Sequence, residues 1–292
     1  MKKKILVLGS GGLIGHKVFI FLKNLKQYDI YDISNSRKIS DNTILLDARS
    51  QDLLYQKIKE INPDFIINCI GVLIKRSEQN PKDAIYLNAY LPHLIKEISN
   101  EIGAKIIHIS TDCVFSGSKK SPYEEGDLKD GEDIYSKTKG LGEINDDYHL
   151  TLRTSVVGPE LAPGGEELFH WFMNQKVLID GYTKSFWSGV TTIELARAVH
   201  QGIVLNITGL HHVTNNQKIN KYELLSLFKK YTKKSIEIRK IDGRTTDKSF
   251  VDTRAALKNN IPSYEDMIFE MVEDIKENKE LYSHYLKEDM QV

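Results

Sequence analysis

The sequence predicts an α/β protein, with a doubly wound parallel sheet and a smaller α+β subdomain. Three observations predict this class. Short apolar segments alternate with helical periodicity through the first half of the chain, which is the pattern of successive βαβ units. A glycine-rich turn separates the first expected strand from the first expected helix. After Arg153 the alternation changes, and prolines and glycines interrupt it.

The composition excludes several other classes of protein. The 292 residues are 40% hydrophobic, which is enough for one large core or two modest ones. Lys plus Arg number 40, as do Asp plus Glu, so the zero net charge gives no reason to expect a nucleic-acid or membrane partner. Two cysteines suit a reducing cytosol. The first apolar run is too short for a signal peptide, so we expect a cytoplasmic protein.

The first half of the chain is expected to supply the strands of the parallel sheet. Residues 5–8 form an apolar run that ends at a glycine, as a buried strand does. The residues that follow repeat apolar side chains at the spacing of one helical face. Further strands are expected at 30–33, 44–46, 65–69, 105–109 and 150–153, with helices near 51–61, 83–101 and 133–145.

The second half is expected to form the smaller subdomain. It begins with a short aromatic helix at 168–172, continues with helices at 192–205, 221–232 and 263–278, and has strands at 211–214 and 236–241. We expect residues 1–154 to form the larger domain, joined by a segment near 189–208. Residues 155–188 and 209–292 would then form the subdomain, packed at the carboxyl ends of the main strands.

The turn after the first strand carries three glycines at a spacing of three residues. Gly9 permits a tight turn, Gly12 permits close approach of a pyrophosphate, and Gly15 lets the helix pack closely on the strand. The amino end of the helix offers free N–H groups to phosphate. This context favours a Rossmann-like dinucleotide site, contacted by Gly9, Gly12, Leu13 and Ile14, over a plain strand–turn–helix.

The end of the second strand is expected to contact the adenosine ribose. A carboxylate at this point is typical of NAD-binding proteins. Here Ser34 falls on that position, and Arg37 and Lys38 follow it. A hydroxyl and two cations suit a 2′-phosphate, so we predict NADP(H) rather than NAD(H). Asp32 would face the ribose instead if the register were shifted by two, and loop cations are often only solvated.

Two later strand ends add candidate cofactor contacts. Asp47 is expected to accept a hydrogen bond from the adenine amine, with Ala48 beside the ring. The segment 68–71 ends the fourth strand, where the backbone of Gly71 would pass the nicotinamide ribose. Cys69 is expected to be a small buried side chain, since no His or basic residue is spaced so that it would activate the thiol. We expect no metal site.

Tyr135 and Lys139 lie four residues apart, which places them on one face of a helix. A phenol titrates near pH ~10, and a neighbouring ammonium is expected to lower its pKa. Tyr135 can then act as a general acid toward a carbonyl oxygen whose carbon receives hydride. Lys139 would also hydrogen-bond the nicotinamide ribose. Taken alone, this pair is more typical of a surface helix.

A second motif changes that interpretation. The strand at 105–109 leads into Ser110-Thr111-Asp112, which places a hydroxyl at the carboxyl edge of the sheet, where open α/β sheets bind ligands. By itself this triplet is typical of a turn or a helix cap. A strand-end hydroxyl, a loop and then Tyr-x-x-x-Lys, all after the glycine turn, favour a reductase-like site.

With these motifs the sequence resembles the extended short-chain dehydrogenase/reductase superfamily, and within it the dTDP-4-dehydrorhamnose reductase branch of nucleotide-sugar enzymes. The resemblance extends over residues 5–155 and is carried by the glycine turn, Asn68-Cys69, Asn88, and the segments 110–117, 135–143 and 153–159. It implies that Thr111, Tyr135 and Lys139 are catalytic.

The resemblance also implies residues of the sugar site, namely Asp112, Val114 and Phe115. Trp187 in the smaller part of the chain is a further candidate for contact with the sugar, although clustered aromatic residues are more typical of a core. Cys113 stands where an aromatic residue is usual in this branch. Homodimers are ordinary in the family.

The function that the resemblance implies is NADPH-dependent reduction of the 4-keto group of a nucleotide-linked deoxysugar, in polysaccharide biosynthesis. Hydride would reach C4 while Tyr135 protonates O4 and Thr111 holds that oxygen. Dehydration is disfavoured because Cys113 replaces an acidic residue of the sister dehydratases. A nucleotide-sugar epimerase and a non-catalytic NADP-binding regulatory subunit are the alternatives. Such subunits tend to lose part of the catalytic trio, which this chain keeps.

Overall fold

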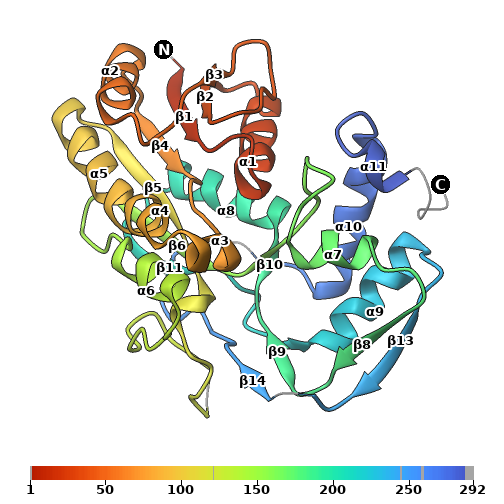
Figure 1. Cartoon of the computed structure of the whole chain (residues 1–292). Coiled ribbons are helices and arrows are strands. Elements are labelled where there is room, and N and C mark those ends of the chain that lie inside the picture. Colours follow the sequence, from red (N-terminus) through yellow and green to blue (C-terminus); the bar gives the residue numbers. More distant parts are fainter. Residues whose placement is uncertain (1, 121, 244, 258–259, 287–292) are drawn as a thin grey trace.

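One seven-stranded parallel sheet forms the larger part of the protein (Figure 1). The structure is a computed structural model that describes residues 2–120, 122–243, 245–257 and 260–286. The strand order is β11-β6-β5-β4-β1-β2-β3. The strands are β1 (Lys3–Leu8), β2 (Tyr28–Ser34), β3 (Ile44–Leu45), β4 (Phe65–Asn68), β5 (Lys105–Thr111), β6 (Leu150–Thr154) and β11 (Gly209–His212). The order reverses between β1 and β4, and open α/β sheets bind ligands at such a reversal.

Helices cover both faces of this sheet. On one face α1 (Leu13–Asn24) packs beside α8 (Thr192–Val204), and on the other lie α2 (Gln51–Ile61) and α5 (Leu91–Ile102). Successive residues of β1 therefore enter different cores: Ile5 and Val7 join one cluster of buried side chains, and Leu6 and Leu8 the other. Because both faces are buried here, the central strands β1 and β4 carry continuous apolar runs, at residues 5–8 and 65–67.

Among its described residues, the smaller part of the protein contains short sheets, one of them mixed, and four helices. Strand β7 (Val156–Val157) pairs with β10 (Val190–Thr191), β8 (Leu178–Tyr182) with β13 (Glu237–Ile241), and β9 (Ser185–Trp187) lies between β12 (Ile219–Asn220) and β14 (Thr246–Asp247). The helices are α7 (Leu168–Met173), α9 (Lys221–Thr232), α10 (Tyr264–Glu277) and α11 (Ser283–Leu286). The predicted fold class, a Rossmann-like parallel sheet with a smaller α+β part, is confirmed.

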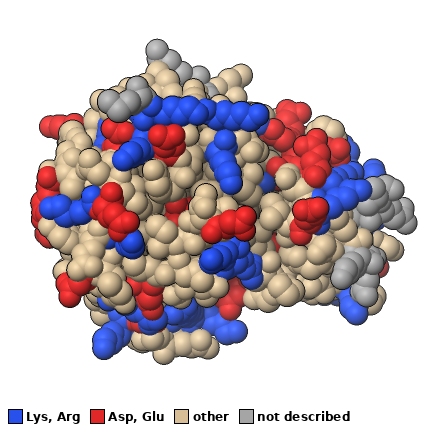
Figure 2. Space-filling model, turned by 90° about the horizontal axis from the view of Figure 1, so that it is seen from above, with Lys and Arg blue, Asp and Glu red and all other residues tan. Residues whose placement is uncertain are grey.

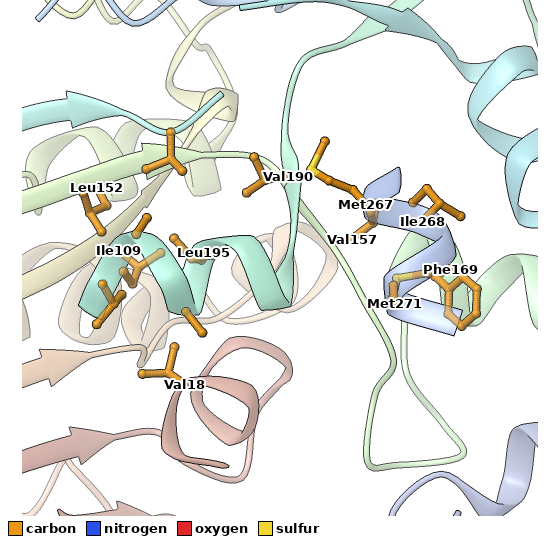
Figure 3. Close-up of a cluster of buried hydrophobic side chains, with 14 of the residues drawn as sticks. Val18, Ile109, Leu152, Val157, Phe169, Val190, Leu195, Met267, Ile268 and Met271 are labelled. Carbon is orange, nitrogen blue, oxygen red and sulfur yellow. The ribbon is translucent and has the colours of Figure 1, made fainter. Parts of the chain in front are cut away.

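One hydrophobic cluster runs from the sheet into the smaller part (Figure 3). It contains Val18 and Leu195 from the two helices on the sheet, and Phe169 and Met271 from α7 and α10. Val157 lies between these groups in the close-up. The two parts of the chain therefore share a core.

Lysine, arginine and carboxylate side chains are interspersed on the face drawn in Figure 2. Among the described residues, no helix is both long enough and apolar enough to cross a bilayer.

The segment expected as one helix over 83–101 is a compound element. It consists of α4 (Pro81–Ala84), a π-helix η1 (Ile85–Tyr90) and α5. In the π-helical turn, the Asn88 side chain accepts a hydrogen bond from the Val72 N–H (2.9 Å) and donates to the Val72 carbonyl (3.1 Å) and to Thr138 Oγ1 (3.3 Å). Such turns are frequent at functional sites. Here the turn connects the loop after β4 to α6 (Ile134–Leu141).

A buried ion pair holds α6 against the sheet. Glu143, just after α6, and Arg153 on β6 are each 2% exposed, and both Arg153 Nε and Nη2 lie 2.7 Å from the carboxylate. Ser110 at the end of β5 donates to Glu143 Oε1 (2.6 Å). Burial alone would raise the pKa of Glu143, but the hydrogen bonds and charge of Arg153 lower it below its usual value. The pair therefore stays ionised and connects β5, α6 and β6.

Close packing of α6 is tested by Gly142→Ala. A Cβ at Gly142 would lie 2.0 Å from the Asn88 carbonyl oxygen, a backbone atom, so α6 must move away from η1. We expect the free energy of unfolding to fall by about 1–3 kcal/mol, measured by chemical denaturation. Gly126→Ala is the matched control, because a Cβ at that position meets no atom within 4 Å. Equal stability of the two variants would contradict this account.

The ion pair is tested by Arg153→Met, which removes the guanidinium from the buried Glu143 carboxylate and leaves it only the half-exposed Lys129 ammonium, 3.2 Å away. We expect the free energy of unfolding to fall by about 3–5 kcal/mol. The double variant Glu143→Gln/Arg153→Met should recover much of this loss, because an amide replaces the stranded charge. A single variant as stable as the unchanged protein would mean that the pair contributes nothing.

Candidate functional site

Two adjoining cavities form a groove at the carboxyl ends of β1, β2, β4 and β5. The first has a volume of about 290 Å³ and reaches from the glycine turn to the end of β2. The second has a volume of about 650 Å³ and reaches from the same turn to the end of β5. Gly12, Leu13 and Gly71 line both cavities, so the groove is continuous.

The glycine turn has the geometry that its spacing predicts. Gly9 has a φ of +82°, which favours glycine. A Cβ at Gly15 would lie 2.1 Å from the Gly9 carbonyl oxygen, so only glycine lets α1 pack this closely on the turn. Gly12 is the N-cap of α1, and no side chain caps that end. The free N–H groups of α1 thus begin at the groove, with Gly9 in the first cavity and Ile14 in the second.

The end of β2 brings Ser34 and Arg37 into the first cavity. Ser34 lies under the turn, since a Cβ at Gly11 would be 2.5 Å from its Oγ. Asp32 is buried and accepts a hydrogen bond from Ser10 Oγ (2.6 Å), so its carboxylate already has a partner inside the protein. Lys38 is exposed and is not among the residues that line the first cavity.

Asp47 and Ala48 also line the first cavity, next to a residue that the sequence analysis missed. Arg49 donates to both carboxylate oxygens of Asp47, and its Nη1 lies 3.2 Å from Asp83 Oδ1. The hydrogen bonds from Arg49 lower the pKa of Asp47. Arg76 completes this cluster by donating to Asp83 (3.0 Å). Arg49 follows Asp47 closely in the sequence, but no local pattern indicates its pairing with Asp83.

The three candidate catalytic residues all line the second cavity: Thr111 from the end of β5, and Tyr135 and Lys139 from α6. Lys139 Nζ donates to the Ile109 carbonyl (2.7 Å). A Cβ at Gly71 would lie 4.0 Å from the same nitrogen, so the Lys139 ammonium lies close to the wall that both cavities share.

Burial determines the protonation of these groups. It raises the pKa of Tyr135 well above its usual value, although a hydrogen bond with Thr111 opposes the shift. It lowers the pKa of Lys139 to about 8, against the charge of Glu143. The expectation of a lowered pKa for Tyr135 is therefore wrong for this structure, because desolvation of the phenolate dominates and the nearby Asp112 and Glu167 act in the same direction. The phenol is fully protonated at neutral pH and can donate a proton.

Asp112 and Cys113 line the second cavity beside the trio. Thr111 Oγ1 lies 3.2 Å from Asp112 Oδ1 and accepts a hydrogen bond from the Cys113 N–H (3.1 Å). Burial raises the pKa of Asp112, and it raises the pKa of Cys113 to about 12. Cys113 is therefore a neutral thiol at physiological pH and is unsuited to act as a base.

The structure does not bring three predicted sugar contacts to the described cavities. Val114, Phe115 and Trp187 are buried and line neither cavity. The Phe115 ring stacks on Tyr123, with centroids 4.1 Å apart. Trp187 packs against Tyr264 at 5.6 Å. These side chains pack behind the site rather than lining it.

The smaller part of the chain supplies acidic side chains to the second cavity that the sequence analysis missed. Glu160, Glu166 and Glu167 line this cavity opposite the strand ends. Burial, with the charge of Glu160, raises the pKa of Glu167 to about 7. No local motif marks these positions, because they follow Pro159 in an irregular loop whose path depends on packing.

Several known proteins are similar to this chain in sequence. Over 225 residues the chain is 28% identical to the spore coat polysaccharide biosynthesis protein SpsK of Bacillus subtilis, covering 75% of this chain and 76% of that protein. It is 31% identical over 141 residues to dTDP-4-dehydrorhamnose reductase of Salmonella typhimurium, covering 44% of this chain and 47% of the relative. It is 26% identical over 242 residues to methionine adenosyltransferase 2 subunit beta of Xenopus tropicalis, covering 76% and 70%.

A solved structure has the same fold along almost the whole chain. It is dTDP-4-dehydrorhamnose reductase of Bacillus anthracis in complex with NADP, with a TM-score of 0.80 and 22% identity, over 94% of this chain and 100% of the other. Residues 3–255 match the family described as the RmlD substrate binding domain. The match spans the sheet, both cavities and most of the smaller part of the chain. This chain therefore belongs to the RmlD substrate-binding-domain family.

Proposed function

We propose that the protein is an NADPH-dependent reductase of the 4-keto group of a nucleotide-linked deoxysugar, similar to the dTDP-4-dehydrorhamnose reductases. One observation carries the proposal. Thr111, Tyr135 and Lys139 line the second cavity, of about 650 Å³, and this cavity shares a wall with the first cavity, which lies beside the glycine turn. A proton donor and a dinucleotide site therefore meet at one place.

The groove fits a dinucleotide. Free N–H groups at the amino end of α1 and the absence of side chains at Gly9 and Gly12 suit a pyrophosphate. Ser34 and Arg37 in the first cavity suit a 2′-phosphate, which supports NADP(H) over NAD(H). Asp32 is paired with Ser10 and does not compete for the ribose hydroxyl.

In the proposed mechanism Tyr135 holds its proton until the reaction requires it. The phenol donates this proton to the substrate oxygen, and Thr111 donates a hydrogen bond to the same oxygen. The Lys139 ammonium stabilises the negative charge that Tyr135 acquires. Bound NADPH supplies the hydride to the carbonyl carbon. Thr111, Tyr135 and Lys139 are buried, and burial strengthens their electrostatic interactions because less water screens them.

The relationship to methionine adenosyltransferase 2 subunit beta favours a second candidate, a binding subunit that holds the dinucleotide without turnover. It covers 76% of this chain. The catalytic trio in one cavity supports the reductase instead. An epimerase of the same superfamily would use the same residues and is distinguished by its product.

The function is tested by incubating the protein with dTDP-, UDP- and GDP-linked 4-keto sugars while following the absorbance of NADPH, with NADH in parallel. We expect one substrate to consume NADPH faster than NADH and to give a 4-hydroxy sugar. An isomerised sugar without net consumption of coenzyme would indicate an epimerase. Binding of NADPH without turnover of any sugar would favour the binding subunit.

Tyr135→Phe removes the proposed proton donor and leaves the ring. We expect kcat to fall about 10²–10⁴-fold, while the Kd for NADPH, measured by fluorescence, stays within about twofold. Tyr148→Phe is the control, because Tyr148 is an exposed tyrosine that also loses a hydrogen bond, to the Gly103 carbonyl (3.1 Å). Full turnover by Tyr135→Phe would eliminate this residue as the acid.

The reaction should depend on pH through Lys139. Its pKa of about 8 means that the ammonium is present below pH 8 and is lost above it, whereas Tyr135 stays protonated. We expect kcat/KM for reduction to fall as the pH rises through about 8. The residual activity of Lys139→Arg should lack this decline, because a guanidinium keeps its proton. A decline that persists in Lys139→Arg would assign it to another group.

A further inference from the structure

Two buried tyrosines near the end of the described chain contact the two walls of the cofactor groove. Tyr282 follows α10, and Tyr285 lies three residues later on α11, which is blue in Figure 1. They are 0% and 3% exposed. Both rings belong to the core cluster shared by the two parts of the protein. A buried hydroxyl destabilises the fold unless it is hydrogen-bonded, so each phenol needs a partner.

Tyr282 reaches the glycine turn through His16. The His16 Nδ1 lies 2.8 Å from the Gly12 carbonyl oxygen, and its Nε2 lies 2.8 Å from the Tyr282 hydroxyl. Burial lowers the pKa of His16 to about 4, so the ring is neutral and carries one proton. A carbonyl can only accept, so Nδ1–H donates to Gly12 and Nε2 accepts from Tyr282.

Tyr285 reaches the opposite wall, the irregular loop after Pro159. Its hydroxyl accepts a hydrogen bond from the Glu160 N–H (3.0 Å) and lies 2.7 Å from His170 Nδ1. His170 Nε2 lies 3.1 Å from the Pro163 carbonyl oxygen. Since that carbonyl only accepts, Nε2–H donates to it, and in the neutral imidazole Nδ1 accepts from Tyr285. The phenol thus fixes the loop at Glu160 and, through His170, at Pro163.

The two walls face each other across the first cavity. Gly9 and Gly12 line it from the turn, and Glu160, Leu161 and Ala162 line it from the loop. Lys17 of α1 anchors the segment that carries the tyrosines, because its Nζ lies 2.5 Å from Asp274 Oδ2 and 5.2 Å from the centre of the Tyr282 ring. The position of the glycine turn is thereby linked to the position of the loop after Pro159.

We propose that Tyr282 and Tyr285 are positioning residues that set the width of the dinucleotide groove through their hydroxyl groups. The inference rests on the proposed function only in that the groove binds a dinucleotide. The rings alone would satisfy the packing, so the hydroxyl groups carry the effect. If one of these hydroxyl groups is removed, the wall that it holds loses a hydrogen bond. That wall must then become ordered when the ligand binds. That ordering lowers affinity.

The test compares Tyr282→Phe and Tyr285→Phe with Tyr264→Phe. Tyr264 is also buried and donates to a carbonyl, that of Gln217 (2.6 Å), but it is not among the residues lining either cavity. We expect the Kd for NADPH, measured by fluorescence, to rise about tenfold for each of the first two variants, the effect of one hydrogen bond. The control should match the unchanged protein. In turnover the KM for NADPH should rise, while kcat at saturating NADPH is retained.

Hydrogen–deuterium exchange separates positioning from a general loss of stability. Tyr282→Phe should accelerate exchange in the turn over residues 9–15, and Tyr285→Phe in the loop over residues 158–167. If either variant does not fold, His16→Phe or His170→Phe removes the other partner of the same hydrogen bond. Unchanged Kd and exchange in the folded variants would overturn the inference alone. Failure of the unchanged protein to bind any dinucleotide would overturn the proposed function as well.

Discussion

The buried ion pair between Glu143 and Arg153 determines how the candidate site is assembled. It joins β6 to the end of α6, and through Ser110 it reaches the residue before Thr111. Each of the three candidate catalytic residues lies on an element that this pair connects. Its charge also acts on the site, because Glu143 raises the pKa of Lys139 against the effect of burial. The same ion pair therefore affects both the position of the candidate catalytic residues and the protonation of Lys139.

Desolvation gives the site its chemical character. It raises the pKa of three side chains that line the second cavity, Tyr135, Asp112 and Glu167, and lowers that of Lys139. Every shift favours the uncharged form of the group. A site of this kind suits a reaction in which a neutral carbonyl becomes charged only transiently, since the protonated Tyr135 phenol already lies in the cavity.

Local spacing predicted the parts of the site that depend on a single turn, strand end or helix. The glycine turn, the hydroxyl at the end of β5, and the pair Tyr135 and Lys139 are such features. The pairing of Arg49 with Asp83 was not predictable, because 34 residues separate them. Trp187 was a candidate for the sugar pocket, with a core position as the alternative, and its packing against Tyr264 places it in the core. The sign of the pKa shift of Tyr135 was missed because it depends on burial depth, which a motif does not encode.

The contact between His16 and Tyr282 spans 266 residues of sequence. Contacts this distant close a very long loop, and proteins dominated by them fold slowly. The glycine turn is therefore connected through His16 to Tyr282 only in molecules whose final helices have docked. A ligand held by that turn would bind the finished molecule in preference to partly folded forms, so it would stabilise the protein against unfolding by mass action. In a cell, coenzyme supply would then influence how much of the newly made chain survives proteolysis.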